Sequence, residues 1–429
     1  MSARIRFYPW QNLCRLSGAL TAAVIFLSIM IIFQTAESAT PSPKPASSSN
    51  DKAGKEGVSS VIRPSTAAVI AGAFSQEDGY GIIISALKNP SSDVRMRALE
   101  IIRERPARFP AEKVRALLNE DKDTDIKIQA AVTLAAMNDR TGANYLRSIA
   151  FNKPKLSSSP TVAERVKYFS AQNTRIKAIV NLGRIKDYAS LNLLEGETKD
   201  EDGRVADAAW IALAYLGNKK GVDIFVDGLK NSDRSVRARA AEIVGDIGAA
   251  DGIPLLRERL SDWDKDVRIA AIRSIGKLKD IQSAPKLREI IFSDKEQLSR
   301  EAAARALGDI GDASPETISF LKRYLYDENV AVRLAVCHSL ARLGDYSGKD
   351  FVKALAERGA EKEARYSAVK ALEDFPLGSD EDKNFLSNLV YDEDPLTSLE
   401  ALKILTFGVR KNSDFSVGKT TNTQRGAKK

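Results

Sequence analysis

Few residues in this chain could carry covalent or metal-dependent chemistry. Its 429 residues include one histidine, His338, and two cysteines, Cys14 and Cys337. A nucleophilic serine or cysteine needs a general base within hydrogen-bond reach, and His338 is the only imidazole that could serve. One histidine cannot supply a metal centre built on several imidazole ligands. Neither a Gly-rich phosphate loop nor a CxxC pair occurs in the sequence.

The remaining groups able to do chemistry are carboxylates, which could act in pairs as general acid and base. They are abundant, but many stand at repeated positions that begin helices, where they act as caps. In the same repeating pattern, Cys337 shares an apolar position with Trp210 and Ile272, so we expect it to be buried. His338 follows at a position held elsewhere by charged residues such as Glu242, and we expect it to be exposed. We therefore expect no catalytic residue, no metal and no cofactor, and a protein that is not an enzyme.

The pattern that positions these side chains is a repeat of 31 to 33 residues. Residues 233–245 and 264–276 agree in their aspartate, valine, arginine and glycine positions. A period of this size, sustained about ten times, indicates a solenoid whose units bury their apolar faces against their neighbours. We expect a long, open superhelix of about ten units. The arginine position recurs at Arg95, Lys127, Arg175, Ala206, Arg237, Arg268, Arg300, Arg333, Arg365 and Leu396.

Each unit contains two helical patterns. In the second, as in Val236 to Gly248, apolar residues three and four positions apart line one face of an α-helix. The first is shorter and often opens with Gly or Pro, as at Pro254, because a missing N–H is tolerated in a first turn. Glycines at 217, 248, 311 and 344 predict left-handed helix ends. Capping side chains are predicted at Ser91, Asp123, Asp202, Asp233, Asp264, Asn329 and Asp392.

The repeated motif D-x-x-V-R-x-x-A-A-x-x-L-G carries a resemblance. Written here as DRSVRARAAEIVG and DWDKDVRIAAIRSIG, it resembles the HEAT-like repeat family, in the short bacterial form first associated with phycobilin lyases. The resemblance covers roughly residues 80 to 407 and implies an all-α solenoid of two-helix repeats. Iron-binding enzymes of the family use several His-Glu pairs, which a single histidine cannot provide. Members bind many unrelated molecules, so the resemblance implies no particular partner.

Two features suggest a partner-binding surface. Between units two and three the spacing grows to 48 residues, and the additional material lies at about 151–164, where Pro and Ser predict a loop or a longer connection. Beside it, the repeat position that holds charged residues such as Glu242 elsewhere holds the apolar residues Val132, Val180 and Ile211, with Tyr215 one turn further on. We expect these four residues to form an apolar strip for a peptide or protein. The alternatives are a tolerated surface insertion and burial of the strip by a bend in the stack.

The arginine position also has two interpretations. A row containing Arg237, Arg268, Arg300, Arg333 and Arg365 could bind an anionic ligand. We favour pairing of these arginines with acidic residues of adjacent turns and repeats, which would brace the stack.

The ends of the chain differ from its middle. Residues 1–39 place three arginines before the apolar run 16–33 and a small-residue segment, the order of a secretory signal peptide. Cleavage after Ser38 or retention as an N-terminal membrane anchor both remain open, and in either case the repeats should be exported. Residues 40–63 predict a disordered linker, 64–407 the solenoid, and 408–429 a basic disordered tail.

The net charge of +8 comes from the two ends. Residues 1–50 and 408–429 together contain ten basic and two acidic residues. The middle of the chain therefore holds 55 of the 65 basic and 55 of the 57 acidic residues, and its net charge is zero. A neutral solenoid argues against a nucleic acid partner. We expect a scaffold that binds a protein partner in the bacterial cell envelope, periplasmic or attached to the membrane. Alternatives are an accessory protein of the phycobilin-lyase kind that holds a tetrapyrrole or its acceptor protein, and an envelope protein that binds glycan or lipid through its basic tail.

Overall fold

The computed structural model describes residues 75–358 and 361–409. By its contacts the chain divides into two units, 1–58 and 59–429. The first, with the predicted leader and most of the predicted linker, lies outside the described residues, as does the tail beyond Val409. The described residues form twenty α-helices and six short 3-10 helices, with no strand among them. The prediction of an all-α solenoid is confirmed. No helix in the described ranges is both long enough and apolar enough to cross a bilayer.

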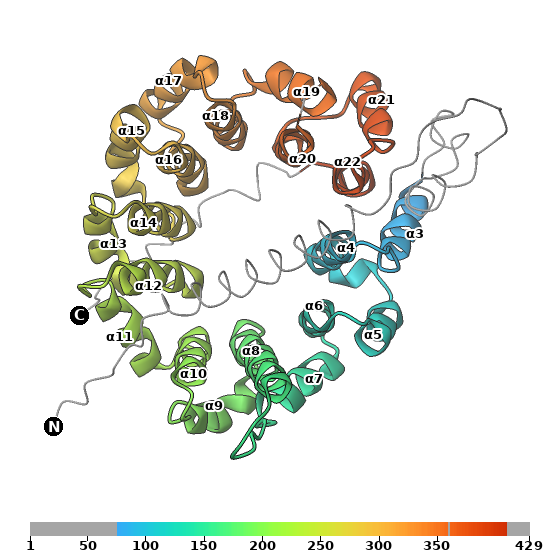
Figure 1. The fold of residues 1–429 in the computed structure, drawn as a ribbon. Coiled ribbons are helices and arrows are strands. Elements are labelled where there is room, and N and C mark those ends of the chain that lie inside the picture. The colour runs from blue at the N-terminus through green and yellow to red at the C-terminus, as the bar shows by residue number, and fades with distance from the viewer. Residues whose placement is uncertain (1–74, 359–360, 410–429) are drawn as a thin grey trace, which may run out of the picture. The chain divides into compact units, whose positions relative to one another are not determined.

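The helices lie in two layers (Figure 1). The first helix of each unit lies in the outer layer, and these ten helices are α3 (Gln76–Ala86), α5 (Ala111–Glu120), α7 (Arg140–Ala150), α9 (Leu191–Glu197), α11 (Lys219–Gly228), α13 (Ile253–Arg259), α15 (Ala284–Ser293), α17 (Pro315–Arg323), α19 (Lys349–Arg358) and α21 (Asp380–Leu389).

The second helix of each unit lies in the inner layer. These helices are α4 (Ser92–Glu104), α6 (Thr124–Ala136), α8 (Val162–Arg184), α10 (Gly203–Tyr215), α12 (Arg234–Ile247), α14 (Lys265–Lys277), α16 (Gln297–Ile310), α18 (Val330–Arg342), α20 (Lys362–Ala371) and α22 (Pro395–Phe407). Units 1 to 10 are the successive pairs from α3/α4 to α21/α22, so the described residues hold the predicted ten units.

The predicted helix signals act largely as expected. Asp123, Asp202, Asp233, Asp264 and Asn329 each accept a hydrogen bond from a first-turn amide. The four predicted glycines all have left-handed backbone, with φ between 73° and 87°.

Two predicted caps differ from the structure. Ser91 precedes α4 but makes no side-chain capping bond. In the last unit the cap is Asp394 rather than Asp392, because Pro395 occupies the first turn and starts the helix two residues later. Asp392 instead accepts the Asp394 amide and pairs with Arg365.

The arginine position braces neighbouring units. Arg237 donates from Nε and Nη2 to both carboxylate oxygens of Asp262, at 2.9 Å each, in the loop of the next unit. Arg268 makes the same two bonds to Asp294, at 2.8 and 3.0 Å. Paired bonds of this kind fix the geometry between units. The structural interpretation is confirmed for these arginines, although the partner acids lie two residues before the cap rather than at it.

Successive inner helices approach closely because small residues face one another. A methyl group at Gly245 would collide with the side chain of Ser274, and one at Gly183 would collide with the backbone of Ala212. Ser274 Oγ also donates to the Ala241 carbonyl of the preceding inner helix at 2.7 Å. Close spacing in the inner layer, with wider spacing outside it, curves the stack.

The curvature brings the last unit back onto the first. Helix α22 packs against α3 and α4, so units 1 to 10 form a ring (Figure 1). Glu400 of α22 is fully buried and accepts hydrogen bonds from Arg97 of α4, at 2.9 Å from Nε and 2.5 Å from Nη2. Lys403 of α22 lies 2.9 Å from Glu104 of α4 and 3.0 Å from Glu373, in the short 3-10 helix that follows α20.

An apolar contact completes this seam. Tyr80 of α3 lies 5.7 Å from the Phe407 ring of α22, and Phe109 contacts both rings at centroid distances of 5.5 and 6.2 Å. Gly79 gives the close approach, since a methyl group there would collide with Thr406. The expectation of an open superhelix is therefore wrong: the outward faces of the two end units are buried against each other.

Candidate functional site

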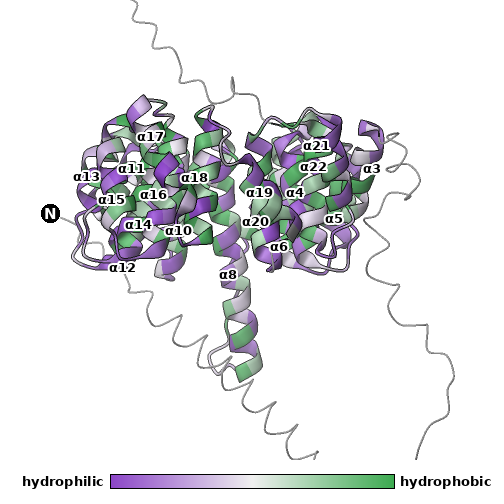
Figure 2. Cartoon of the chain, turned by 90° about the horizontal axis from the view of Figure 1, so that it is seen from above, coloured by the Kyte–Doolittle hydropathy of each residue, from purple (hydrophilic) through white to green (hydrophobic). Residues whose placement is uncertain are grey.

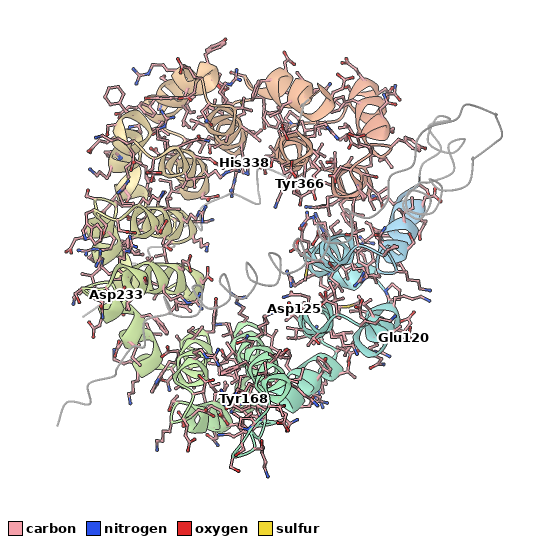
Figure 3. The ribbon with its side chains drawn as sticks, in the orientation of Figure 1. Glu120, Asp125, Tyr168, Asp233, His338 and Tyr366 are labelled. Carbon is pink, nitrogen blue, oxygen red and sulfur yellow. The ribbon has the colours of Figure 1, made fainter. Side chains whose placement is uncertain are left out.

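The groups first considered for chemistry do not assemble into a nucleophilic pair. Cys337 is fully buried, and burial raises the pKa of its thiol to about 12, so it stays protonated at neutral pH. His338 points to the inside of the ring (Figure 3), with Nδ1 3.3 Å from an oxygen of Asp374. Within the described ranges, no group of three or more His, Cys, Asp or Glu side chains is placed to hold a metal.

The predicted apolar strip is not an exposed surface. Val132, Ile211 and Tyr215 are buried, and Val180 is half-buried against the core. They pack in or against the apolar core that the helices of neighbouring units form. The structure thus agrees with burial by the stack, and the expectation of an open strip is wrong.

Tyr215 has a structural role on the inner face. Its hydroxyl donates to Asp246 at 2.9 Å, and the Arg184 guanidinium lies 5.6 Å from its ring centre. Lys277 reaches the other oxygen of Asp246 at 2.5 Å. One side chain from each of α8, α10, α12 and α14 thereby forms a continuous polar chain between consecutive units. These side chains are matched to one another, so this part of the inner face is already electrostatically satisfied.

The insertion builds the most prominent exposed feature. Helix α8 has 23 residues, whereas most inner helices have 13. Residues 152–160 are a loop, and from Val162 onward the additional residues are helical. Thr161 caps this helix, its hydroxyl accepting from the Glu164 amide while Glu164 accepts from the Thr161 amide. The prediction of a loop over 151–164 is therefore correct only for its first part. Figure 2 shows the beginning of α8 extending beyond the rest of the ring.

An apolar stripe follows one side of this projection. Val162, Val166 and Phe169 are 80%, 62% and 51% exposed, and their spacing of four and three residues places them on one helix face. The Phe169 ring contacts Tyr168, at a centroid distance of 5.6 Å, and lies 5.9 Å from the guanidinium of Arg204. A contiguous apolar stripe on a surface helix is a feature that usually marks a contact with another molecule.

A groove of about 940 Å³ runs beside the stripe. Val166 lies where the stripe and the groove meet, so one continuous surface joins them. The groove is open to solvent and combines apolar carbon with hydroxyl and amide groups. Its lining comes from the start of α6, the end of α7 and the projecting part of α8, namely Thr124, Ser148, Ile149, Asn152, Ala163, Val166, Lys167, Ser170, Ala171 and Thr174.

The site has a fixed position relative to the chain ends. All inner helices run in one direction, so α8 projects from the rim at which they begin. The described chain starts and ends at the opposite rim, because Gly79 near the start of α3 packs against Thr406 near the end of α22. The groove therefore lies at one rim of the ring, and the first and last described residues lie at the other.

The sequence predicted a partner-binding surface near the insertion, but the four residues named for it are buried or half-buried, and the exposed stripe of α8 was not predicted. The sequence VAERVKYF at the start of α8 spaces Val162, Val166 and Phe169 as a helical stripe, and that signal was available. It was missed because the prolines and serines just before it suggested a loop throughout.

Solved structures similar to this chain include human deoxyhypusine hydroxylase in complex with glycerol, which is 20% identical, with 62% of this chain and 96% of that chain covered and a TM-score of 0.30. The CpcE and CpcF complex of phycocyanin lyase from Nostoc sp. PCC7120 is 18% identical over 61% of this chain and 97% of that one, with a TM-score of 0.34. YIBA from E. coli is 18% identical over 64% and 97%, with a TM-score of 0.29. At these TM-scores the likenesses carry no argument about function.

A comparison with curated proteins found no match. A family model described as HEAT repeats matches residues 162–242, 222–308 and 284–373. The helix pairs of those segments continue in the same arrangement on both sides, from α3 to α22. Residues 162–373 therefore consist of HEAT repeats, and the units on both sides share their two-helix arrangement.

Proposed function

We propose that this protein is a non-catalytic scaffold that binds a protein partner through the groove beside α8, in the bacterial cell envelope. The observation that carries the proposal is the exposed stripe of Val162, Val166 and Phe169 against the groove. Each of these side chains leaves apolar surface in water that a partner would cover, at roughly 25 cal/mol for each Å² removed from water. The ring exposes other apolar side chains, among them Trp263, Phe292 and Tyr326, but none of them lines this groove.

The placement of the site supports presentation to a partner. The order of basic, apolar and small residues in 1–39 favours export, which would bring the solenoid into the compartment of envelope proteins. The α8 projection extends beyond the rest of the ring, so it would be open to a protein in that compartment.

A photo-crosslinking amino acid at position 166 tests the site in envelope fractions of the source cell. The matched control carries the same group at Leu193, which is 51% exposed on the outer helix α9. We expect a discrete crosslinked protein from position 166 that is absent from position 193 and is lost when Phe169→Ser is added. Equal crosslinking from both positions, or none from either, contradicts the proposal. Visible absorbance of the purified protein would instead indicate a bound pigment.

A further inference from the structure

The electrostatics of the α8 groove specify its partner further, an inference that rests on the proposed function. We propose that the groove binds an amphipathic segment whose apolar side chains cover Val162, Val166 and Phe169 and whose carboxylates meet Lys155, Arg165 and Lys167. The partner is thus an acidic, apolar segment of a protein, most simply one helix laid along the projecting half of α8.

The cations are placed on both sides of the stripe. At about 100° per residue, Arg165 lies on one side of the line through Val162, Val166 and Phe169, and Lys167 lies on the other, where it lines the groove. Lys155 stands in the loop that leads into α8 and is exposed. An apolar contact flanked by basic groups matches a helix whose apolar face is flanked by acidic groups.

These cations have no acidic partner among the described residues, and the nearby carboxylates are already engaged. Glu164 is held by its hydrogen bonds to Thr161, which also lower its pKa. Asp125 of α6 accepts from Lys177 through both oxygens, at 2.6 and 2.7 Å.

Behind the loop, Asp200 is paired with Lys153 and with Arg175, at 3.1 and 3.0 Å. Lys155, Arg165 and Lys167 therefore leave a local positive charge beside the groove. A negatively charged partner would neutralise it.

The shape of the site favours a protein segment over a lipid surface. A flat bilayer could touch the stripe, but it would leave the concave groove beside Val166 unfilled. A convex helix can occupy the groove and contact Ile149 and Ala171 inside it. Three apolar residues over two turns also correspond to the length of one helix-in-groove contact.

The test uses the full-length protein and three fluorescein-labelled helical peptides of about 18 residues, long enough for five turns. The first has leucines on one face flanked by glutamates, the second has the same leucines flanked by lysines, and the third has serines in place of the leucines with the glutamates kept. Fluorescence anisotropy measures their affinities at low and high salt. Vesicles of phosphatidylcholine and phosphatidylglycerol at 3:1 provide the lipid probe in a co-sedimentation assay.

We expect the glutamate–leucine peptide to bind at least tenfold more tightly than either other peptide, with an affinity that falls as salt rises. Arg165→Glu with Lys167→Glu should reverse the preference between the glutamate and lysine peptides. The matched control, Lys88→Glu with Lys295→Glu, changes two exposed lysines elsewhere and should leave the preference intact. Circular dichroism and thermal melting show whether each variant is folded.

Each contrary outcome has a distinct meaning. Equal affinity for the two leucine peptides, both lost in Val166→Ser, would overturn the acidic partner while leaving the groove as a protein site. Binding of vesicles that depends on Val166, without binding of any peptide, would overturn the inference in favour of a membrane contact. Peptide binding that is unchanged in Val166→Ser would remove both the inference and the proposed groove.

Discussion

Glu400 provides the sharpest test of the ring. Its carboxylate is fully buried on α22 and accepts two hydrogen bonds from Arg97 of α4, across the seam between the last unit and the first. Burial alone would lower the pKa of Arg97, but the charge and hydrogen bonds of Glu400 and Glu100 outweigh it and leave the pKa raised. Glu400→Gln keeps the shape of the side chain and removes its charge, so the perturbation falls on the seam.

The free-energy cost of Glu400→Gln depends on which acidic partners Arg97 and Lys403 keep. Removing one member of a buried ion pair costs about 3–5 kcal/mol because the other charge is left uncompensated. Arg97 still has Glu100 at 2.8 Å, and Lys403 still has Glu373 at 3.0 Å. We therefore expect the lower end, about 3 kcal/mol, which shifts the ratio of closed to open rings by roughly 100-fold, since about 1.4 kcal/mol is a factor of ten.

The assay is energy transfer between dyes on Lys88→Cys and Lys383→Cys, on either side of the seam, in a background with Cys14→Ser. Cys337 is buried and should not label. Wild-type protein should show strong transfer and Glu400→Gln weak transfer, with the same helical content by circular dichroism, because only one contact between units is lost.

Asp262→Asn is the matched control, since it removes a buried carboxylate from Arg237 between units 5 and 6. It should lower the melting temperature without changing transfer across the seam. Loss of helicity in Glu400→Gln, or weak transfer in the wild type, would refute the closed ring as a separable contact.

Three further predictions concern single side chains. Burial raises the pKa of Asp207 to about 6, although the attraction of Arg239 lowers it. The stabilising contribution of Asp207 is therefore present below about pH 4 and is lost as pH rises through 6. In urea titrations, Asp207→Asn should raise the unfolding free energy at pH 8 by at most about 3 kcal/mol and leave it unchanged at pH 4. Gly245→Ala should cost about 1–3 kcal/mol by collision with Ser274, and adding Ser274→Gly should restore only part of the loss of thermal stability, because the backbone at position 274 is also in the way. Thr161→Ala should remove about 1 kcal/mol of helix capping, so that hydrogen exchange becomes faster in the first turns of α8 while the rest of the ring is unchanged.

The repeat architecture could be predicted because its signals are local. Aspartates such as Asp233 cap helices through contacts within one turn, and glycines such as Gly248 end them through their own backbone. Bracing by Arg237 and Arg268 could also be predicted, because aspartates such as Asp264 recur in the same short segments, although the partners themselves are Asp262 and Asp294. Such features are repeated in sequence, so each unit supports the prediction made from the next.

The features that were missed depend on contacts with no repeated counterpart. The seam joins Arg97 to Glu400 across 303 residues of sequence. Every residue of α22 from Thr397 to Ile404 is buried, although the polar residues of this segment predict an exposed side for a terminal inner helix. Burial of Ile211 depends on how closely α8, α10 and α12 approach, which the column of small residues determines and the apolar pattern alone does not.

Closure of the ring also changes how the array should respond to heat and to rearrangement of its chain. In an open array of repeats the two end units have one neighbour each and fray first, so protection from hydrogen exchange declines towards both ends. Here units 1 and 10 each have two neighbours, and the amides of α3 and α22 should exchange about as slowly as those of helices in the middle.

The proximity of Gly79 to Thr406 also permits a circular permutant. A short linker between the first and last units, with new ends in the 152–160 loop, should keep every contact between units.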